Sequence, residues 1–139
     1  MAFLGSLDIV GSALSAERFR MDVTLQNISN AKTTRTKNGE PYRRQQVVFQ
    51  ERELSFDKTL ETVSGGVQVA DVVKSDRDFH PVYDPSHPDA DENGYVLYPN
   101  VDTTEERLDL MTASTAYEAN LTALSVMKAM INRTLEMSK

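Results

Sequence analysis

The final third of the chain carries an apolar repeat that is longer than one small domain can cover. Apolar side chains recur every seven residues from position 110 onward, and no glycine or proline interrupts residues 102–137. This pattern predicts one amphipathic helix, about 50 Å long at 1.5 Å per residue. A compact domain of this chain length is under about 40 Å across, so the apolar face needs another long helix or another copy of the chain. The positions of this C-terminal seam are Leu110, Tyr117, Leu121, Leu124, Ile131 and Leu135.

The start of this helix is marked by residues that cap helix N-termini. Asp102, Thr103 and Thr104 each offer a side-chain oxygen to the first turn. Glu105 and Glu106 follow at the spacing of a capping box, in which the glutamate reaches back to the capping residue. We therefore expect the helix to begin near residue 102, with its first acidic side chains engaged in the cap.

A second seven-residue repeat lies at the opposite end of the chain. Residues 3–29 predict a helix that is firmest over 12–29, because Gly5 and Gly11 weaken its first turns, and Asn30 is a suitable stop. The two repeats can pair within one chain if the middle segment returns the chain to its starting point. The positions of this N-terminal seam are Leu7, Leu14, Met21, Leu25 and Ile28.

The segment between the two helices is rich in strand and turn signals. Residues 42–50, 67–72, 82–83 and 94–99 favour short strands, and Asn38-Gly39 and Gly65-Gly66 favour turns. Residues 51–64 fit either a strand or a short helix. The sequence thus predicts an α+β fold, in which long N- and C-terminal helices form a coiled pair beside a small β-rich middle region. The expected units are residues 1–31, 32–101 and 102–139.

The charges are segregated along the chain, although the net charge is only −6. Residues 32–44 hold five basic residues against one acid, and residues 71–106 hold ten acids against two bases. No basic footprint for nucleic acid is present, and we expect the basic and acidic segments to meet between neighbouring subunits. No apolar run reaches the length of a membrane span, so we expect neither membrane insertion nor a cleaved signal peptide.

An acidic loop over residues 84–92 is the strongest candidate for chemistry. Its carboxylates, with His80 and His87 nearby, could hold Ca²⁺ or Zn²⁺ in a metal-dependent enzyme. The spacing fits neither an EF-hand loop nor an HExxH helix, and a solvated turn that carries charge explains the residues better. We therefore expect no enzyme, with no catalytic, cofactor-binding or metal-binding residue. An adaptor that binds a foreign helical partner is a further alternative.

Two terminal stretches identify the chain more closely. SALSAERFRMDVTLQNISNAKTTRT, residues 12–36, resembles the N-terminal signature of bacterial flagellar rod and hook proteins, with Asn27 and Asn30 at its asparagine positions. LMTASTAYEANLTALSVMKAMINRTLEM, residues 110–137, resembles the C-terminal helix of the same family. Its Ser-Arg-x-Tyr-x-Ala-Asn core ends here at Asn120, and Thr115 replaces the usual arginine.

A third stretch narrows the resemblance within the flagellar basal-body rod protein family. VYDPSHPDADENGYVLYPNVD, residues 82–102, is similar to the hallmark of the C-type proximal rod proteins. The residues that carry this likeness are Asp84, Pro85, His87, Pro88, Gly94, Tyr95, Pro99 and Asn100.

The resemblance implies a structural subunit without a cofactor. Such a subunit would self-assemble helically through its terminal helices and form the hollow, torque-transmitting drive shaft of the flagellum. Its partners would be copies of itself, other proximal and distal rod proteins, the rod–ring adaptor and the flagellar type III export apparatus. It would lie in the basal body, in the rod that crosses the periplasm, and would be exported without a cleaved signal peptide. The alternative within the family is a different axial subunit.

Overall fold

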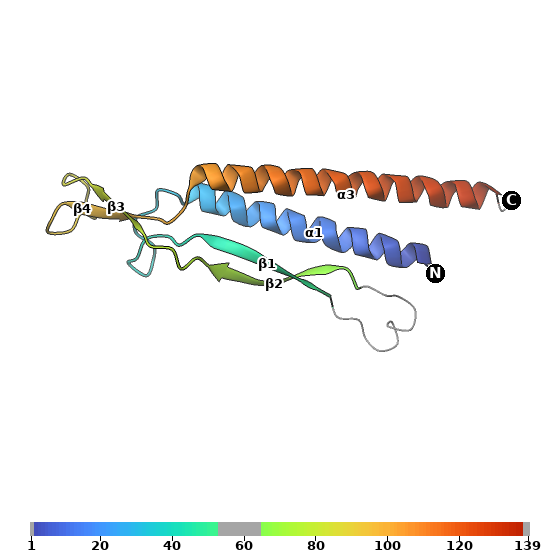
Figure 1. The fold of residues 1–139 in the computed structure, drawn as a ribbon, viewed down its shortest axis with the longest axis horizontal. Helices are drawn as coiled ribbons and strands as arrows, with labels where there is room; N and C mark the ends of the chain where they lie inside the picture. The colour runs from blue at the N-terminus through green and yellow to red at the C-terminus, as the bar shows by residue number, and fades with distance from the viewer. Residues whose placement is uncertain (1, 53–64, 138–139) are drawn as a thin grey trace.

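The computed structural model describes residues 2–52 and 65–137, and it has the α+β organisation expected from the sequence (Figure 1). The two ends of the chain form the long helices α1 (Ala2–Ser29) and α3 (Thr103–Met137). Between them lie β1 (Gln45–Glu51), β2 (Val67–Lys74), β3 (His80–Tyr83) and β4 (Tyr95–Tyr98). Of the segment that fits either a strand or a helix, residues 53–64 lie outside the described residues.

The helices α1 and α3 lie side by side and run in opposite directions, which confirms the predicted coiled pair (Figure 1). Small and β-branched residues form the buried centre of this part of the molecule. Val10, Ala16 and Val23 of α1 and Ala113 of α3 are all buried. Because Ala113 is fully buried, the two helix backbones can approach closely at this point.

The C-terminal end of α1 and the N-terminal end of α3 lie where the sequence predicts them. The backbone N–H of Asn30 donates to Gln26 O at 3.0 Å, which closes the last turn of α1. At the start of α3, Asp102 Oδ1 accepts a hydrogen bond from the backbone N–H of Thr104 at 2.8 Å. These backbone bonds to its carboxylate lower the pKa of Asp102, because they favour the charged form.

The expected second half of the capping box is wrong. Glu105 forms an ion pair with Arg77 Nη1 at 2.7 Å, and the buried Glu106 accepts from Arg44 and Asn27. A glutamate in the first turn can reach the cap only when no stronger partner is near. Here two arginines from the middle region bring a positive charge to each carboxylate, which a backbone N–H at the cap does not offer.

The strands β1 and β2 form an antiparallel hairpin that packs on α1. Val47 and Phe49 are half-buried, whereas Gln46, Val48 and Gln50 are exposed, so one face of the hairpin covers the helix. A bulge falls between Val48 and Phe49. Since α1 contacts both the hairpin and α3, it forms the middle layer of this part of the molecule (Figure 1).

The first strand begins at Gln45 rather than at the expected residue 42, because the preceding backbone has other partners. Tyr42 N–H donates to Thr33 O at 3.1 Å, and Arg44 N–H donates to Asn100 Oδ1 at 2.8 Å. These bonds take the place of cross-strand hydrogen bonds at the start of the hairpin.

The strands β3 and β4 form a second antiparallel ribbon at the end of the molecule away from the chain termini (Figure 1). The rings of Tyr83 and Tyr95 meet edge to face, with 5.3 Å between their centroids. Val96 is buried, whereas the rest of the ribbon is largely exposed.

In the described parts of the chain, neither helix combines the length and the apolar character that a membrane crossing requires.

Candidate assembly surface and helix junction

The C-terminal seam lies on the side of α3 that packs against α1. Positions three, four and seven apart share a helix face, so the repeat lies beside the fully buried Ala113. Leu121 and Leu135 remain 43 % and 59 % exposed, and α3 extends past the N-terminal end of α1 (Figure 1). The half-buried members of the seam are Leu110, Tyr117, Leu124 and Ile131.

The N-terminal seam is also only partly covered. Leu25 is 47 % exposed, and the other members, Leu7, Leu14, Met21 and Ile28, are half-buried. Pairing of α1 with α3 therefore removes part of each seam from water and leaves the remainder accessible.

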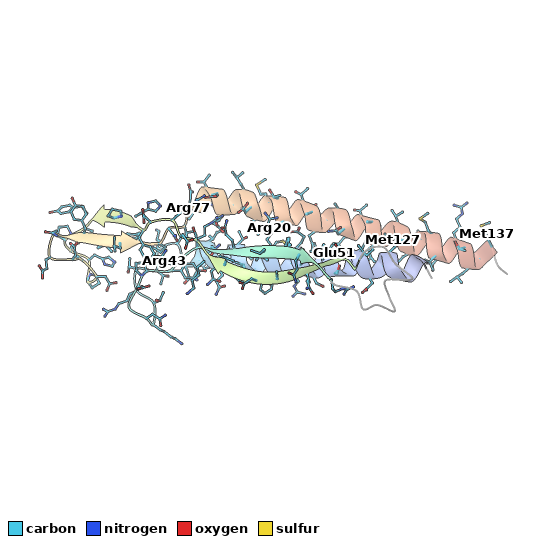
Figure 2. The ribbon with its side chains drawn as sticks, turned by 60° about the horizontal axis from the view of Figure 1, so that its bottom comes forward. Arg20, Arg43, Glu51, Arg77, Met127 and Met137 are labelled. Atoms are coloured by element: carbon cyan, nitrogen blue, oxygen red, sulfur yellow. The ribbon has the colours of Figure 1, made fainter. Side chains whose placement is uncertain are left out.

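A second apolar face of α3 was not recognised in the sequence. At 100° per residue, its members lie about 100–160° around the helix from Ala113, so they face away from α1. Figure 2 shows Met137, one of them, at the distal end of α3. The signal in the sequence is the spacing between its members: positions 108 and 111 are three residues apart, 126 and 130 are four apart, and 130 and 137 are seven apart. Between positions 111 and 126 the same face of the helix carries small side chains. We call this face the outer stripe; its members are Leu108, Met111, Val126, Met130 and Met137, each more than half exposed.

Two asparagines of the family motifs meet at the junction between the helices and the middle region. Asn27 is 1 % exposed and pairs with the backbone of Gln45, donating to its carbonyl at 2.8 Å and accepting from its N–H at 3.0 Å. Tyr42 Oη also donates to Asn27 Oδ1, at 2.9 Å. Burial and then the charge of Glu106 raise the pKa of Tyr42, which keeps its hydroxyl protonated as a donor.

Asn100 has the equivalent role on the other side of the junction. It is 2 % exposed, accepts from the backbone N–H of Arg44 and donates to Arg77 O at 2.8 Å. The preceding Pro99 is also buried. The two motif asparagines therefore act as backbone partners for segments far away in the sequence.

The centre of the junction is a pair that sequence reasoning did not single out. Arg44 and Glu106 are 2 % and 1 % exposed, and Arg44 Nε donates to Glu106 Oε1. Arg44 Nη2 also donates to Asp109 Oδ2 at 3.0 Å. Arg44 appeared in the sequence only as one member of a basic segment, because nothing local marks it for burial.

The segregated charges meet within one chain. Arg35 lies 3.6 Å from Asp89, Arg77 pairs with Glu105, and Arg43 lies over the ring of Phe79 at 4.4 Å. Two arginines of the basic segment 32–44, Arg35 and Arg44, therefore pair with the acidic segment 71–106 inside the subunit. A contact between neighbouring subunits through these segments stays a prediction. Figure 2 shows Arg43 and Arg77 at this junction, beside the start of α3.

The acidic loop uses its oxygens to hold its own turns. Asp84 Oδ1 accepts from the Ser86 hydroxyl at 2.6 Å and from Ser86 N–H at 3.1 Å, and these bonds lower the pKa of Asp84. His87 Nδ1 accepts from the Asp89 N–H at 3.1 Å. Among the residues that the structure describes, no three His, Asp or Glu side chains form a group that could hold a metal ion.

Gly94 and Tyr95 have structural roles in the same loop. Gly94 has a φ of +79°, and a Cβ there would lie 3.0 Å from the Tyr83 ring and 3.1 Å from Pro85. Tyr95 N–H donates to Asp91 Oδ1 at 2.8 Å. Pro88 is exposed beside them.

The remaining motif asparagines lie on the helices. Asn30 caps the end of α1, with its side-chain amide donating to Gln26 O at 2.9 Å. Asn120 is half-buried on α3, at a spacing of seven residues from Ala113. The loop and the helix motifs do not converge on one reactive centre.

Known proteins resemble this chain along its whole length. A family model for the C-terminal region of flagellar basal body rod FlgEFG proteins matches residues 92–137. The flagellar basal-body rod protein FlgC of Bacillus subtilis (strain 168) is 44 % identical over 100 % of both chains. The FlgC proteins of Salmonella typhimurium and Borreliella burgdorferi are 42 % and 37 % identical, over 100 % and 97 % of each chain. These full-length matches confirm the resemblance seen in the sequence, and the chain belongs to the FlgC family of flagellar basal-body rod proteins.

Proposed function

We propose that this structural rod subunit assembles helically through α1 and α3, and that the assembly is a hollow shaft that transmits torque. The observation that carries the proposal is the presence of two apolar faces on α3. One face packs on α1, and the outer stripe faces away from it. A helix that is apolar on opposite sides is normally buried on both, so the outer stripe needs a partner outside the chain.

The size of the uncovered surface supports an assembly role. Full burial of one large aliphatic or methionine side chain stabilises by about 1.5–3 kcal/mol. The outer stripe provides several such side chains in one row, and the exposed parts of Leu25, Leu121 and Leu135 add to the accessible apolar surface. Large apolar side chains exposed together on one face of a helix mark interaction sites.

The layered arrangement suggests how each part would contribute. We assign residues 1–31 and 102–139 to the inner wall of the rod and residues 32–101 to a region further from its axis. The β1–β2 hairpin covers α1 and leaves the outer stripe of α3 accessible to neighbours. The proposed neighbours are copies of the chain, other proximal and distal rod proteins and the rod–ring adaptor.

The proposed location is the basal body, in the part of the rod that crosses the periplasm. Export would proceed through the flagellar type III apparatus without a cleaved signal peptide. We propose no catalytic activity, in keeping with the structural rod proteins that the chain resembles.

The proposal is tested by placing charge on the outer stripe. In cells, Val126→Asp combined with Met130→Asp should abolish swimming and the completion of the rod, because burial of an unpaired carboxylate is strongly unfavourable. The purified variant should keep the far-UV circular dichroism of the original protein, since both side chains are exposed.

The control is Asn132→Asp, which adds one negative charge on the polar side of the same helix. It should leave swimming intact. Complete rods in cells that carry the double variant would show that the outer stripe faces solvent in the assembly. Loss of swimming in the control alone would place the contact on the polar side instead.

A further inference from the structure

The β1–β2 hairpin and α3 lie on different sides of α1 (Figure 1), and in the described parts of the chain α3 packs on α1 but on neither strand. Their relative position therefore depends on α1, which packs on both, and on any side chain that links them directly. The direct link is the side chain of Arg44, which immediately precedes β1 and reaches Glu106 and Asp109 of α3.

The bridge joins three segments that are distant in sequence, around residues 27, 44 and 100–106. Asn27, at the end of α1, donates to Glu106 Oε2 at 2.8 Å and also holds the Gln45 backbone. Asn100, just before α3, holds the Arg44 backbone. All four polar side chains at this centre, Asn27, Arg44, Asn100 and Glu106, are at most 2 % exposed and hydrogen-bonded.

Opposite charges gather at the junction. Three arginines, Arg20, Arg44 and Arg77, face four carboxylates, those of Glu17, Glu105, Glu106 and Asp109. A buried ion pair adds little net stability compared with apolar residues of similar volume. Its hydrogen bonds are directional, however, and the planar guanidinium can satisfy several acceptors only in one orientation.

We propose that Arg44 is a positioning residue that fixes the hairpin of the middle region relative to α3, so that the rod subunit moves as one rigid body. Without its guanidinium, the two strands would remain paired and in contact with α1, but the hairpin would pivot on α1, so that its angle to α3 would vary. The inference concerns the single subunit and does not depend on how copies assemble.

The experiment measures the position of the hairpin directly. The chain has no cysteine, so spin labels can be attached to cysteines introduced at exposed sites. One label pair, at Gln50 and Thr115, reports the distance between hairpin and α3. A second pair, at Asp22 and Thr115, reports the distance between α1 and α3. Pulsed electron paramagnetic resonance on the full-length monomer then gives both distance distributions.

We expect a single narrow distribution for both pairs in the unsubstituted background. Arg44→Met should broaden the hairpin–α3 distribution and leave the α1–α3 distribution narrow. Arg44→Lys retains the charge but not the planar fork, and should also broaden the hairpin–α3 distance.

Arg44→Met alone leaves the buried Glu106 carboxylate without its guanidinium partner, which destabilises the fold. The double substitution Arg44→Met with Glu106→Met avoids this cost. This variant removes both charges and should unfold cooperatively, yet its hairpin–α3 distribution should still be broad. A hairpin–α3 distribution as narrow as that of the original protein in the folded double variant would overturn the proposal. Equal broadening of both label pairs would also overturn it, because it would indicate a general loss of packing.

Discussion

The closest approach of the two helices can be tested at Ala113. This residue is 0 % exposed and lies on the face of α3 that meets α1. In Ala113→Leu, three additional carbon atoms must enter a space that is already filled. Overpacking of this kind typically costs about 1–3 kcal/mol, and we expect the free energy of unfolding to fall by that amount.

The assay is urea unfolding of the purified monomer followed by far-UV circular dichroism. Small proteins lose about 1–3 kcal/mol of stability per molar urea, so the midpoint should fall by roughly 0.5–1.5 M. The control is Ala119→Leu, which makes the same change at an exposed site of the same helix and should leave the midpoint unchanged. Equal midpoints for both variants would refute the tight helix contact.

Three further substitutions test other parts of the structure. Leu124→Asp, on the half-buried seam, should lower the urea midpoint of the monomer as well as prevent rod completion; an unchanged monomer would contradict its position toward α1. Gly66→Ala should lower the melting temperature, because its Cβ would lie 2.3 Å from Ser12 Oγ at a φ of +85°, and an unchanged melting temperature would argue against this contact. The pKa of Asp102 is lowered on folding, so its contribution to stability is present above the unfolded value near 3.9 and is lost as the pH falls through the folded value. Asp102→Asn should therefore reduce the acid dependence of stability below about pH 4, and an unaltered profile would exclude this role.

Several local features followed from the sequence because they depend on nearby residues only. The ends of both helices are set by Asn30 and Asp102, whose side chains bond backbone groups within a few residues. The expected turns at Gly39 and Gly66 have the positive φ that glycine adopts readily. The family motifs were recognisable for the same reason, since they are short and contiguous.

The site was predictable only in part. Apolar periodicity located both seams, but it did not indicate that each would be half covered by the other helix. The outer stripe escaped notice because the seven-residue repeat already accounted for the apolar character of α3. A helix with two apolar faces shows a weaker pattern than a helix with one.

The sequence by itself determined the two long helices, their caps, the approximate strands and the family, because periodicity, capping and turn chemistry act over a few residues. Only the tertiary structure decided that Arg44 and Glu106 form a buried ion pair, and that Glu105 pairs with Arg77 instead of capping the helix. It also decided that the basic and acidic segments pair within one subunit. The physical reason is that burial and ion pairing depend on which distant segments meet. Residues 27, 44, 100 and 106 come together only when the middle region has returned the chain to the end of its first helix.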